Sequence, residues 1–319
     1  VTVPLIVIFV LFFEFVVFRA ILPASDMPNR SVITSPDDIV RFEYIYGMYD
    51  KGVFRRGEIK ARYNINREGW NSNREYIERK SDKKRIAVIG DSYVEAFNVD
   101  ADKSLAEVLE AAAIKEIGDK VEVYRFGFSG APLSQYLQMM RYVKKKYNPD
   151  MVIVVIVHND FLESIKGFGE GLGDFLKFTK KDGFWVEIKP KPGVYAPNHA
   201  RRALKHSSIA RYLYYNLNIK QFIYFLSSKF KGKDFKMNVD MDEVMANLDT
   251  IKGLSYDIFS KYKETLGPDT RFLLAMDGDR EAIYRGKDPR KERLYALNKI
   301  ACDAAEKLSI PFIDLNDIF

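Results

Sequence analysis

Five short, mostly apolar runs rich in β-branched residues alternate with helix-type patterns along the chain. These runs predict strands at residues 85–89, 121–126, 151–157, 271–276 and 311–315. The third run is almost wholly apolar, as expected of a central strand of a parallel sheet that is covered on both faces. The alternation of strands and helices predicts an α/β domain with a mainly parallel sheet.

Local signals place helices between these strands. Ser104 and Glu107 have the S-x-x-E spacing of a capping box, so a helix is expected to begin there. Residues 134–147 predict a second helix, which Asn148-Pro149 ends. A third helix is expected between residues 291 and 308. The stretch from residue 85 to 157 therefore predicts a βαβαβ unit.

The N-terminal segment has a different pattern. Residues 1–18 are apolar and aromatic except for Thr2, Pro4 and Glu14, and the apolar positions surround the helix rather than forming a stripe. A bilayer core needs about 20 such residues. We expect an incomplete transmembrane segment over residues 1–22, with a cleaved signal sequence as the alternative. An uncleaved anchor is favoured because residues 18–25 offer only a poor cleavage site.

Residues 161–270 are too long for an ordinary crossover and predict an insertion with elements of its own. Residues 184–188 alternate like a strand, expected to form a hairpin near residues 189–193. Residues 208–230 read as an amphipathic helix. Its aromatic side chains are expected to pack against a core, with contact to an acyl chain, a sugar or the membrane surface as alternatives.

Composition excludes several classes of function. The formal charge of +6 is spread over many acidic and basic residues of the 319, so no nucleic-acid partner is expected. Cys302 is the only cysteine, which excludes an intramolecular disulfide. The three histidines, His158, His199 and His206, lack the spacing of metal ligands, so no metal site is expected.

Polar and small residues follow the first three strands of the α/β pattern. Ser92 follows the first strand, a glycine-containing turn at 127–130 follows the second, and Asn159 follows the third. Because parallel strands end at one edge of a sheet, these residues are expected to lie close together. A serine nucleophile needs donors for the developing oxyanion, and a glycine N–H and an asparagine amide can supply them.

At these positions the sequence resembles the SGNH (GDSL-type) hydrolases. Gly90-Asp91-Ser92-Tyr93 resembles the first block of that family, with Ser92 at the nucleophile position. Gly130 matches the glycine of the second block, and Asn159 matches the asparagine of the third. Upstream, the segment 64–71 is similar to the approach segment of membrane-anchored bacterial members.

Two positions depart from the family pattern. Val157 stands where the third block usually has glycine, and no Asp-x-x-His block occurs in the chain. We expect the catalytic histidine and aspartate beyond Phe319. His158 is not expected to replace them, because neighbours on an extended chain point in opposite directions. Asp277, at the end of the fourth strand, is expected to cap the next turn, with substrate binding as the alternative.

The resemblance implies a flavodoxin-like three-layer α/β/α sandwich. The expected organisation is a membrane segment at 1–22, a linker and approach segment at 23–83, and the hydrolase-like domain at 84–319. The implied activity is hydrolysis of O-acyl esters, including O-acetyl groups of surface glycans, through a Ser92 acyl-enzyme without a cofactor. The expected location is a bacterial membrane, with the domain facing the periplasm or exterior. An O-acyltransferase and a non-catalytic glycan-binding or assembly protein remain open alternatives.

Overall fold

The core of the molecule is a five-stranded parallel sheet. The computed structural model describes residues 2–26, 31–34, 40–43, 50–79, 81–169, 175–189, 199, 206–217 and 239–318. The strand order is β11-β10-β7-β5-β6, and every neighbouring pair is parallel. Numbered along the chain, this is the 2-1-3-4-5 order of flavodoxin-like folds. The strands are β5 (Lys84–Gly90), β6 (Val121–Gly127), β7 (Met151–Ile156), β10 (Arg271–Met276) and β11 (Phe312–Asp314), so all five predicted strands are confirmed.

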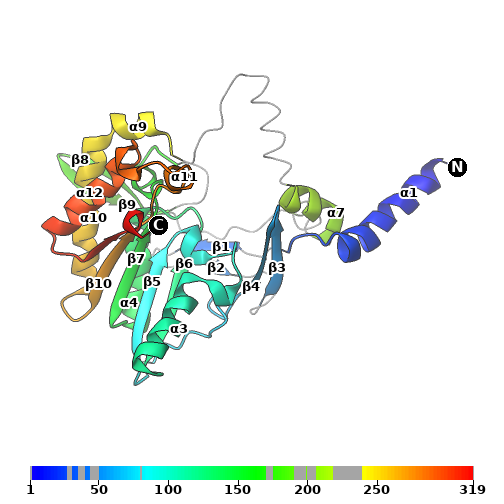
Figure 1. Cartoon of the computed structure of the whole chain (residues 1–319), viewed down its shortest axis with the longest axis horizontal. Coiled ribbons are helices and arrows are strands. Elements are labelled where there is room, and N and C mark those ends of the chain that lie inside the picture. Colours follow the sequence, from blue (N-terminus) through cyan, green and yellow to red (C-terminus); the bar gives the residue numbers. More distant parts are fainter. Residues whose placement is uncertain are drawn as a thin grey trace.

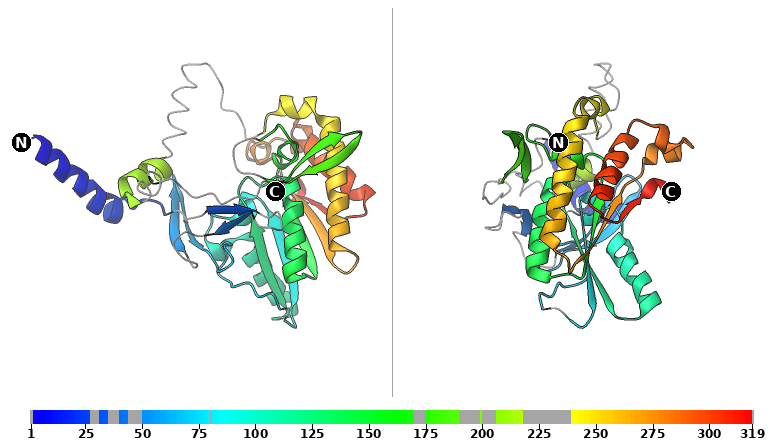
Figure 2. Two further views of the ribbon diagram at one scale, coloured as in Figure 1. Left: turned by 180° about the vertical axis from the view of Figure 1, so that it is seen from behind. Right: turned by 90° about the vertical axis from the view of Figure 1, so that its left-hand side faces the viewer.

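Helices cover both faces of this sheet (Figures 1 and 2). One face buries a large core against α4 (Leu133–Tyr147), α10 (Leu248–Leu266) and α12 (Tyr295–Lys307). The other face packs a smaller core against α3 (Leu105–Ile117). Alternation along β5 divides the two cores, since Ala87 and Ile89 face the first and Val88 the second. The three-layer α/β sandwich is confirmed.

The helix ends follow the sequence signals. The Ser104 side chain caps α3 by accepting a hydrogen bond from the Glu107 N–H at 3.4 Å. The helix α4 ends at Asn148, which adopts the left-handed conformation. The helix α10 lies in the last part of the segment 161–270, yet it is the crossover between β7 and β10 and contributes Ile258, Phe259 and Tyr262 to the core.

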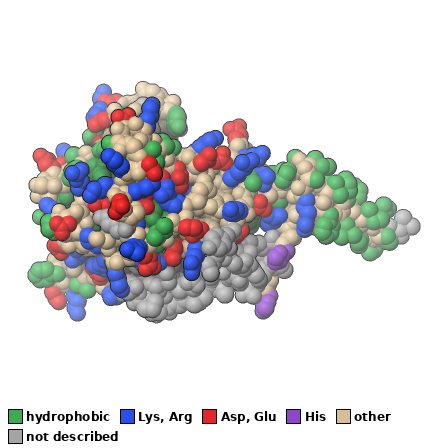
Figure 3. All heavy atoms as spheres, turned by 90° about the horizontal axis from the view of Figure 1, so that it is seen from below, with side chains coloured by type: hydrophobic (Ala, Val, Ile, Leu, Met, Phe, Trp, Pro, Cys, Tyr) green, Lys and Arg blue, Asp and Glu red, His purple; other side chains and the backbone are tan. Residues whose placement is uncertain are grey.

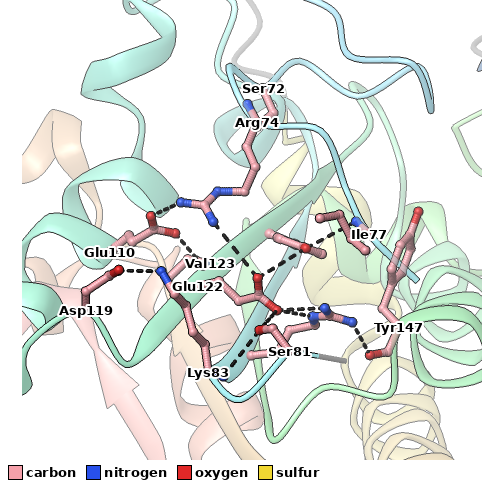
Figure 4. A network of polar contacts seen from close by, with 12 residues as sticks. Ser72, Arg74, Ile77, Ser81, Lys83, Glu110, Asp119, Glu122, Val123 and Tyr147 are labelled. Atoms are coloured by element: carbon pink, nitrogen blue, oxygen red, sulfur yellow. Dashed lines mark hydrogen bonds and ion pairs between the residues drawn. The ribbon is translucent and has the colours of Figure 1, made fainter. Parts of the chain in front are cut away.

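A buried ion pair joins Arg85 near the start of β5 to Glu122 near the start of β6, at the amino end of the sheet. Figure 4 shows the polar contacts around Glu122. Arg85, only 1% exposed, donates from Nε to Glu122 at 2.7 Å and from a terminal nitrogen to the Tyr147 carbonyl at 2.7 Å. Its guanidinium also lies 4.8 Å from the centre of the Tyr124 ring. Such a pair contributes to stability only when its remaining polar groups are satisfied, and here they bond to the backbone.

The described parts of the insertion include a two-stranded hairpin, β8 (Lys177–Lys181) and β9 (Phe184–Ile188). The predicted strand is confirmed and pairs with the strand that precedes it, whereas residues 190–193 of the expected hairpin lie outside the described residues. Asp182 and Gly183 both have positive φ, the conformation that a two-residue hairpin turn requires. Of the predicted helix at 208–230, residues 208–216 are helical, as α7 (Ser208–Arg211) and η3 (Tyr212–Asn216), and 218–230 lie outside the described residues.

The N-terminal helix projects away from the α/β domain (Figures 1 and 2). It consists of α1 (Thr2–Phe12) and η1 (Phe13–Ile21), which continue one another. Two antiparallel pairs follow it, β1 (Ser31–Thr34) with β2 (Val40–Glu43), and β3 (Lys51–Arg56) with β4 (Ile59–Asn64). The remaining short elements are α2 (Ser92–Glu95), η2 (Ala101–Lys103), α5 (Asp160–Glu163), α9 (Met241–Ala246), α11 (Arg280–Tyr284), η4 (Pro289–Lys291) and η5 (Leu315–Asp317).

Candidate active site

Ser92 lies at the carboxyl edge of the sheet, directly after the strand β5. This strand pairs with β6 on one side and β7 on the other, with Gly90 opposite Gly127 and Ile89 opposite Val154. The loops that carry Gly130 and Asn159 therefore flank the loop that carries Ser92, as the sequence predicts. The Ser92 residue is exposed.

The structure places Ser92 on a one-turn helix that the sequence did not predict. The Asp91 side chain caps α2 by accepting from the Tyr93 N–H at 2.9 Å. Two glycines let this turn lie against the strand ends. A Cβ on Gly127 would lie 1.9 Å from the Glu95 nitrogen, and one on Gly90 would lie 2.5 Å from a methyl of Val94.

A buried carboxyl group accepts a hydrogen bond from the Ser92 hydroxyl. The Ser92 Oγ donates to Asp91 Oδ2 at 3.2 Å. Burial raises the pKa of Asp91 to about 6, against which its hydrogen bonds act only in part. Asp91 therefore supplies an acceptor beside the serine whose charge changes near neutral pH.

A second buried carboxyl group, Asp160, lies beside the first. Its Oδ2 accepts from the Tyr136 hydroxyl at 2.7 Å and from the Val157 N–H at 2.8 Å, while Oδ1 has no hydrogen-bond partner among the described residues. Burial, followed by the negative charge of Asp91, raises the pKa of Asp160 well above its usual range. Burial therefore raises the pKa of both carboxyl groups, Asp91 and Asp160.

Glu95 connects the Ser92 helix to the Gly130 loop. This carboxylate is buried and accepts hydrogen bonds from both the N–H and the hydroxyl of Ser129, the N–H at 3.2 Å. Gly130 follows with a φ of +78°, a conformation that favours glycine. Glu95 was not identified from the sequence. Its position three residues after Ser92 is the only signal that could have pointed to it.

Asn159 and His158 differ in their surroundings. Asn159 is half-buried at the start of α5, and its Nδ2 donates to Glu163 at 3.3 Å. His158 is buried and pairs through Nε2 with Asn298 Oδ1 at 2.8 Å, on the side of α12. Burial lowers the pKa of His158. The histidine therefore turns to α12, as expected, although residues 158 and 159 form a turn after β7 and not the extended chain that the prediction assumed.

The approach segment supports the same helix from outside the sheet. Asn71 is buried, and its Nδ2 donates to the Glu95 carbonyl at 2.8 Å. Trp70 is buried and packs its ring edge-on against Phe126 of β6, with ring centres 5.2 Å apart. The segment that resembled membrane-anchored hydrolases thus fixes the end of α2.

An exposed rim completes the site on the side of β10. Asp277 accepts from Arg280 at 3.0 Å, and the Arg280 guanidinium lies 4.3 Å from the centre of the Tyr93 ring. The cap of the following helix α11 is Asp279 rather than Asp277, so the expectation that Asp277 caps this turn is wrong. The i, i+3 spacing of Asp277 and Arg280 was the available signal for this pair.

Among the described residues, none of the histidines donates to or accepts from Ser92. His199 and His206 are exposed, and His158 is engaged by Asn298. A search of the same residues finds no group of three His, Cys, Asp or Glu side chains that could hold a metal ion. A pocket of about 260 Å³ lies at the start of α11, lined by Asp279, Arg285 and Arg293 among others, and does not include Ser92.

Comparison with known proteins points to one family. Residues 86–184 match the family model described as GDSL-like lipase/acylhydrolase. This segment contains Ser92, Gly130 and Asn159. The comparison with curated proteins gave no match.

Similar solved structures include TesA, with 12% identity over 72% of this chain and 77% of that chain and a TM-score of 0.35. Others are a lipase/acylhydrolase from Enterococcus faecalis (12% identity, 74% and 78% covered, TM-score 0.35) and the acetyl xylan esterase AlAXEase (14% identity, 73% and 78% covered, TM-score 0.37). The assignment rests on the family match and not on these similarities. Residues 86–184 are therefore similar to the GDSL-like lipase/acylhydrolase family.

Proposed function

We propose that this protein is a serine esterase of the SGNH type that hydrolyses O-acyl esters through an acyl-enzyme on Ser92. The observation that carries the proposal is the placement of Ser92 on the exposed turn α2, between the loops of Gly130 and Asn159. This placement coincides with a family match that spans all three residues.

The proposed reaction has two steps. The Ser92 Oγ attacks the ester carbonyl, and the N–H groups of Ser92 and Gly130 with the Asn159 amide stabilise the oxyanion. A base takes the Ser92 proton and returns it to the departing alkoxide, which leaves as the alcohol. Water, activated by the same base, then attacks the acyl-serine and releases the carboxylic acid and the serine hydroxyl. By family resemblance the base is a histidine.

Glu95 and Asp91 would support this reaction without contacting the substrate. Glu95 holds the Ser129 N–H and hydroxyl, and thereby the adjacent Gly130, against the turn that carries Ser92. Asp91 fixes the start of that turn and accepts from the Ser92 hydroxyl in the resting state. Such support keeps the oxyanion donors in place before charge develops.

We propose O-acetylated surface glycans as substrates, with the domain tethered to a bacterial membrane and facing the periplasm or exterior. The exposed rim supports this choice. Tyr93 is 43% exposed and the Arg280 side chain 44%, so an aromatic face and a cation flank Ser92. An aromatic face suits the apolar face of a sugar. The helix Thr2–Ile21 is long and apolar enough to cross a membrane, a property that it shares with signal sequences.

The experiment measures acetate release from acetylated xylan oligosaccharides by the wild type, Ser92→Ala and the control Ser260→Ala. Imidazole is added in one series as an external base, because no described histidine bonds to Ser92. Ser92→Ala should lower the rate by at least about 10³-fold, whereas Ser260→Ala should leave it unchanged. Equal rates for the wild type and Ser92→Ala would refute the proposal. Acetyl transfer to an added sugar acceptor, in place of acetate release, would identify a transferase.

A further inference from the structure

We propose that the helical segment of residues 208–216, formed by α7 and η3, packs beside the last turns of the anchor helix and contacts the boundary of the lipid bilayer as a second membrane contact. The proposal rests on the membrane anchoring by Thr2–Ile21 proposed above. It concerns a part of the molecule that the esterase reaction does not use. Three features carry it: bonds to the anchor helix, the depth that these bonds impose, and exposed apolar side chains.

The first feature is the bonding of Glu14 to the start of α7. Glu14 is the only acidic residue of the N-terminal helix. Its carboxylate accepts from the Ser207 hydroxyl at 2.9 Å and from the N–H groups of Ser208 and Ile209 at 2.7 and 3.1 Å. A carboxylate is costly near hydrocarbon unless it has partners. The segment 207–209 therefore satisfies the one acidic group that opposes insertion of the helix.

Further contacts hold η3 against the chain that leaves the helix. The rings of Phe18 and Tyr212 stack with centres 4.4 Å apart. The Asn216 side chain accepts from the Ser25 N–H at 2.8 Å and donates to the Pro23 carbonyl at 3.2 Å. These contacts are distributed from Phe18 to Ser25, so the whole segment, not only its first residue, follows the end of the anchor.

The contacts fix the depth of the segment. Glu14 precedes the end of the helix at Ile21 by seven residues, which is about 10 Å along a helix axis. A helix of 20 residues spans about the 30 Å of the hydrocarbon core. The segment therefore runs beside the last turns of the helix, from the outer part of the hydrocarbon core at Ser208 to the headgroup region at Asn216.

The exposed side chains suit that boundary. Leu213, Tyr214 and Leu217 are 37%, 44% and 56% exposed. The anchor beside them is also apolar, and Figure 3 shows hydrophobic side chains along the projecting helix. In the anchor, Phe15 and Ile21 are 56% and 62% exposed. Tyrosine is enriched at membrane interfaces because its ring is apolar and its hydroxyl polar. Continuity with the anchor makes a bilayer, rather than a protein, the partner.

The experiment measures membrane depth with a fluorescent label. The full chain, with Cys302→Ser to remove its one thiol, is reconstituted in vesicles of phosphatidylethanolamine and phosphatidylglycerol. Single cysteines replace Leu217, Val7 within α1, and Ile117 at the end of α3, and each is labelled with bimane. Val7 and Ile117 are 51% and 54% exposed, so the three sites are matched in accessibility. Lipids with a nitroxide near the headgroup serve as quenchers.

Quenching at Leu217 several-fold above that at Ile117 is the expected result. Quenching at Val7 but not at Leu217 would overturn the bilayer contact and leave the anchor intact; protection of Leu217 from an aqueous quencher in that case would indicate a protein partner. Absence of quenching at Val7 would overturn the anchor and this inference together. None of these outcomes bears on the Ser92-dependent release of acetate, which is measured separately.

Discussion

His158 and Asn159 are consecutive residues that the end of β7 directs to different surroundings. His158 is buried against Asn298, whereas Asn159 is half-buried beside the Ser92 loop. The proposed mechanism therefore assigns the oxyanion donor to Asn159 and not to His158. The amide of Asn159 donates to Glu163 at 3.3 Å, a long hydrogen bond that a stronger acceptor would displace.

Asn159→Ala should therefore lower kcat by about 10²–10³-fold, or about 2.7–4 kcal/mol of transition-state stabilisation, and change KM little. The reason is that negative charge on the oxygen appears only during the reaction. His158→Ala should affect kcat far less and act on stability, because it leaves Asn298 Oδ1 without its partner. Steady-state kinetics of the two variants checks this. A larger kcat effect for His158→Ala would mean that the third block is aligned one residue out of register.

Asp91 should make the protein less stable as the pH rises towards neutrality. Burial raises its pKa to about 6 in the folded state, from 3.8 for a free aspartate side chain, so the folded state binds the proton more tightly than the unfolded state. Stability is therefore greatest below pH 4 with respect to this group, and falls as the pH rises to about 6. The shift corresponds to about 3 kcal/mol, and Asp160 acts in the same direction.

Urea unfolding of the wild type and Asp91→Asn at several pH values between 4 and 7 measures this effect. The asparagine keeps an acceptor for the Tyr93 N–H, so the cap of α2 is preserved. The variant should gain stability relative to the wild type as the pH rises through this range. If the free energies of unfolding of the two proteins changed with pH in parallel, Asp91 would not bind its proton more tightly in the folded state.

The residues of the candidate site differ in how far the sequence determines them. Ser92, Gly130 and Asn159 each follow an apolar strand, so the topology of a parallel sheet is enough to bring them to one edge. Glu95 and Arg280 could not be identified in this way. Their partners, Ser129 and Tyr93, lie on other loops, and only the three-dimensional path of those loops brings them together.

At the scale of elements, the turn α2 depends on a glycine in the neighbouring strand. Gly127 is in contact with Glu95, and a Cβ there would lie 1.9 Å from the Glu95 nitrogen. Gly127→Ala must therefore displace α2 and with it Ser92. We expect a loss of stability of about 1–3 kcal/mol, typical of overpacking, together with a loss of Ser92-dependent activity.

Gly253→Ala, within the helix α10, is the matched control. A Cβ at this position would contact only Trp185 Nε1, at 3.7 Å. This change should stabilise the protein by up to about 1 kcal/mol, because alanine favours a helix over glycine. Thermal unfolding and acetate release would be measured for both variants. Wild-type activity in Gly127→Ala would show that α2 tolerates displacement and does not position Ser92.

The ion pair near the amino end of the sheet should govern stability alone. Arg85→Met leaves Glu122 buried without its main cation, which should cost about 3–5 kcal/mol. Lys83→Met removes a partner of Asp119, whose side chain is 70% exposed, and should cost less than about 1 kcal/mol. Urea unfolding at pH 7 compares the two. Equal and small losses in the free energy of unfolding for the two variants would show that water reaches Glu122 in Arg85→Met.

The five strands could be predicted because each is a run of β-branched residues ended by a turn. The four-residue helix α2 could not, since it is too short for a periodic pattern and is held by contacts with β6 and Asn71. The helix α10 illustrates a different difficulty. It lies within the long segment 161–270 and was not predicted, because the sequence does not say that this part of the segment returns to the sheet.

At the scale of the whole molecule, a series of contacts connects the N-terminal helix to the α/β domain. The Asp26 N–H donates a hydrogen bond of 2.9 Å to the carbonyl of Val53 in β3. The hairpin of β3 and β4 contacts the domain through the rings of Tyr63 and Phe97, whose centres are 5.5 Å apart. In addition, the Arg62 N–H donates to Asp100 Oδ1 at 2.8 Å. These contacts hold the Ser92 edge at a defined place relative to the anchor.

The most direct test of the central claim is whether Ser92 itself becomes acylated. The protein is mixed with p-nitrophenyl acetate and imidazole, quenched with acid within seconds, and digested for mass spectrometry. We predict one acetyl group on the peptide that contains Ser92, located on Ser92 by fragmentation and absent in Ser92→Ala. An acetyl group that remains in Ser92→Ala, or that lies on another residue while Ser92 stays unmodified, would contradict the account.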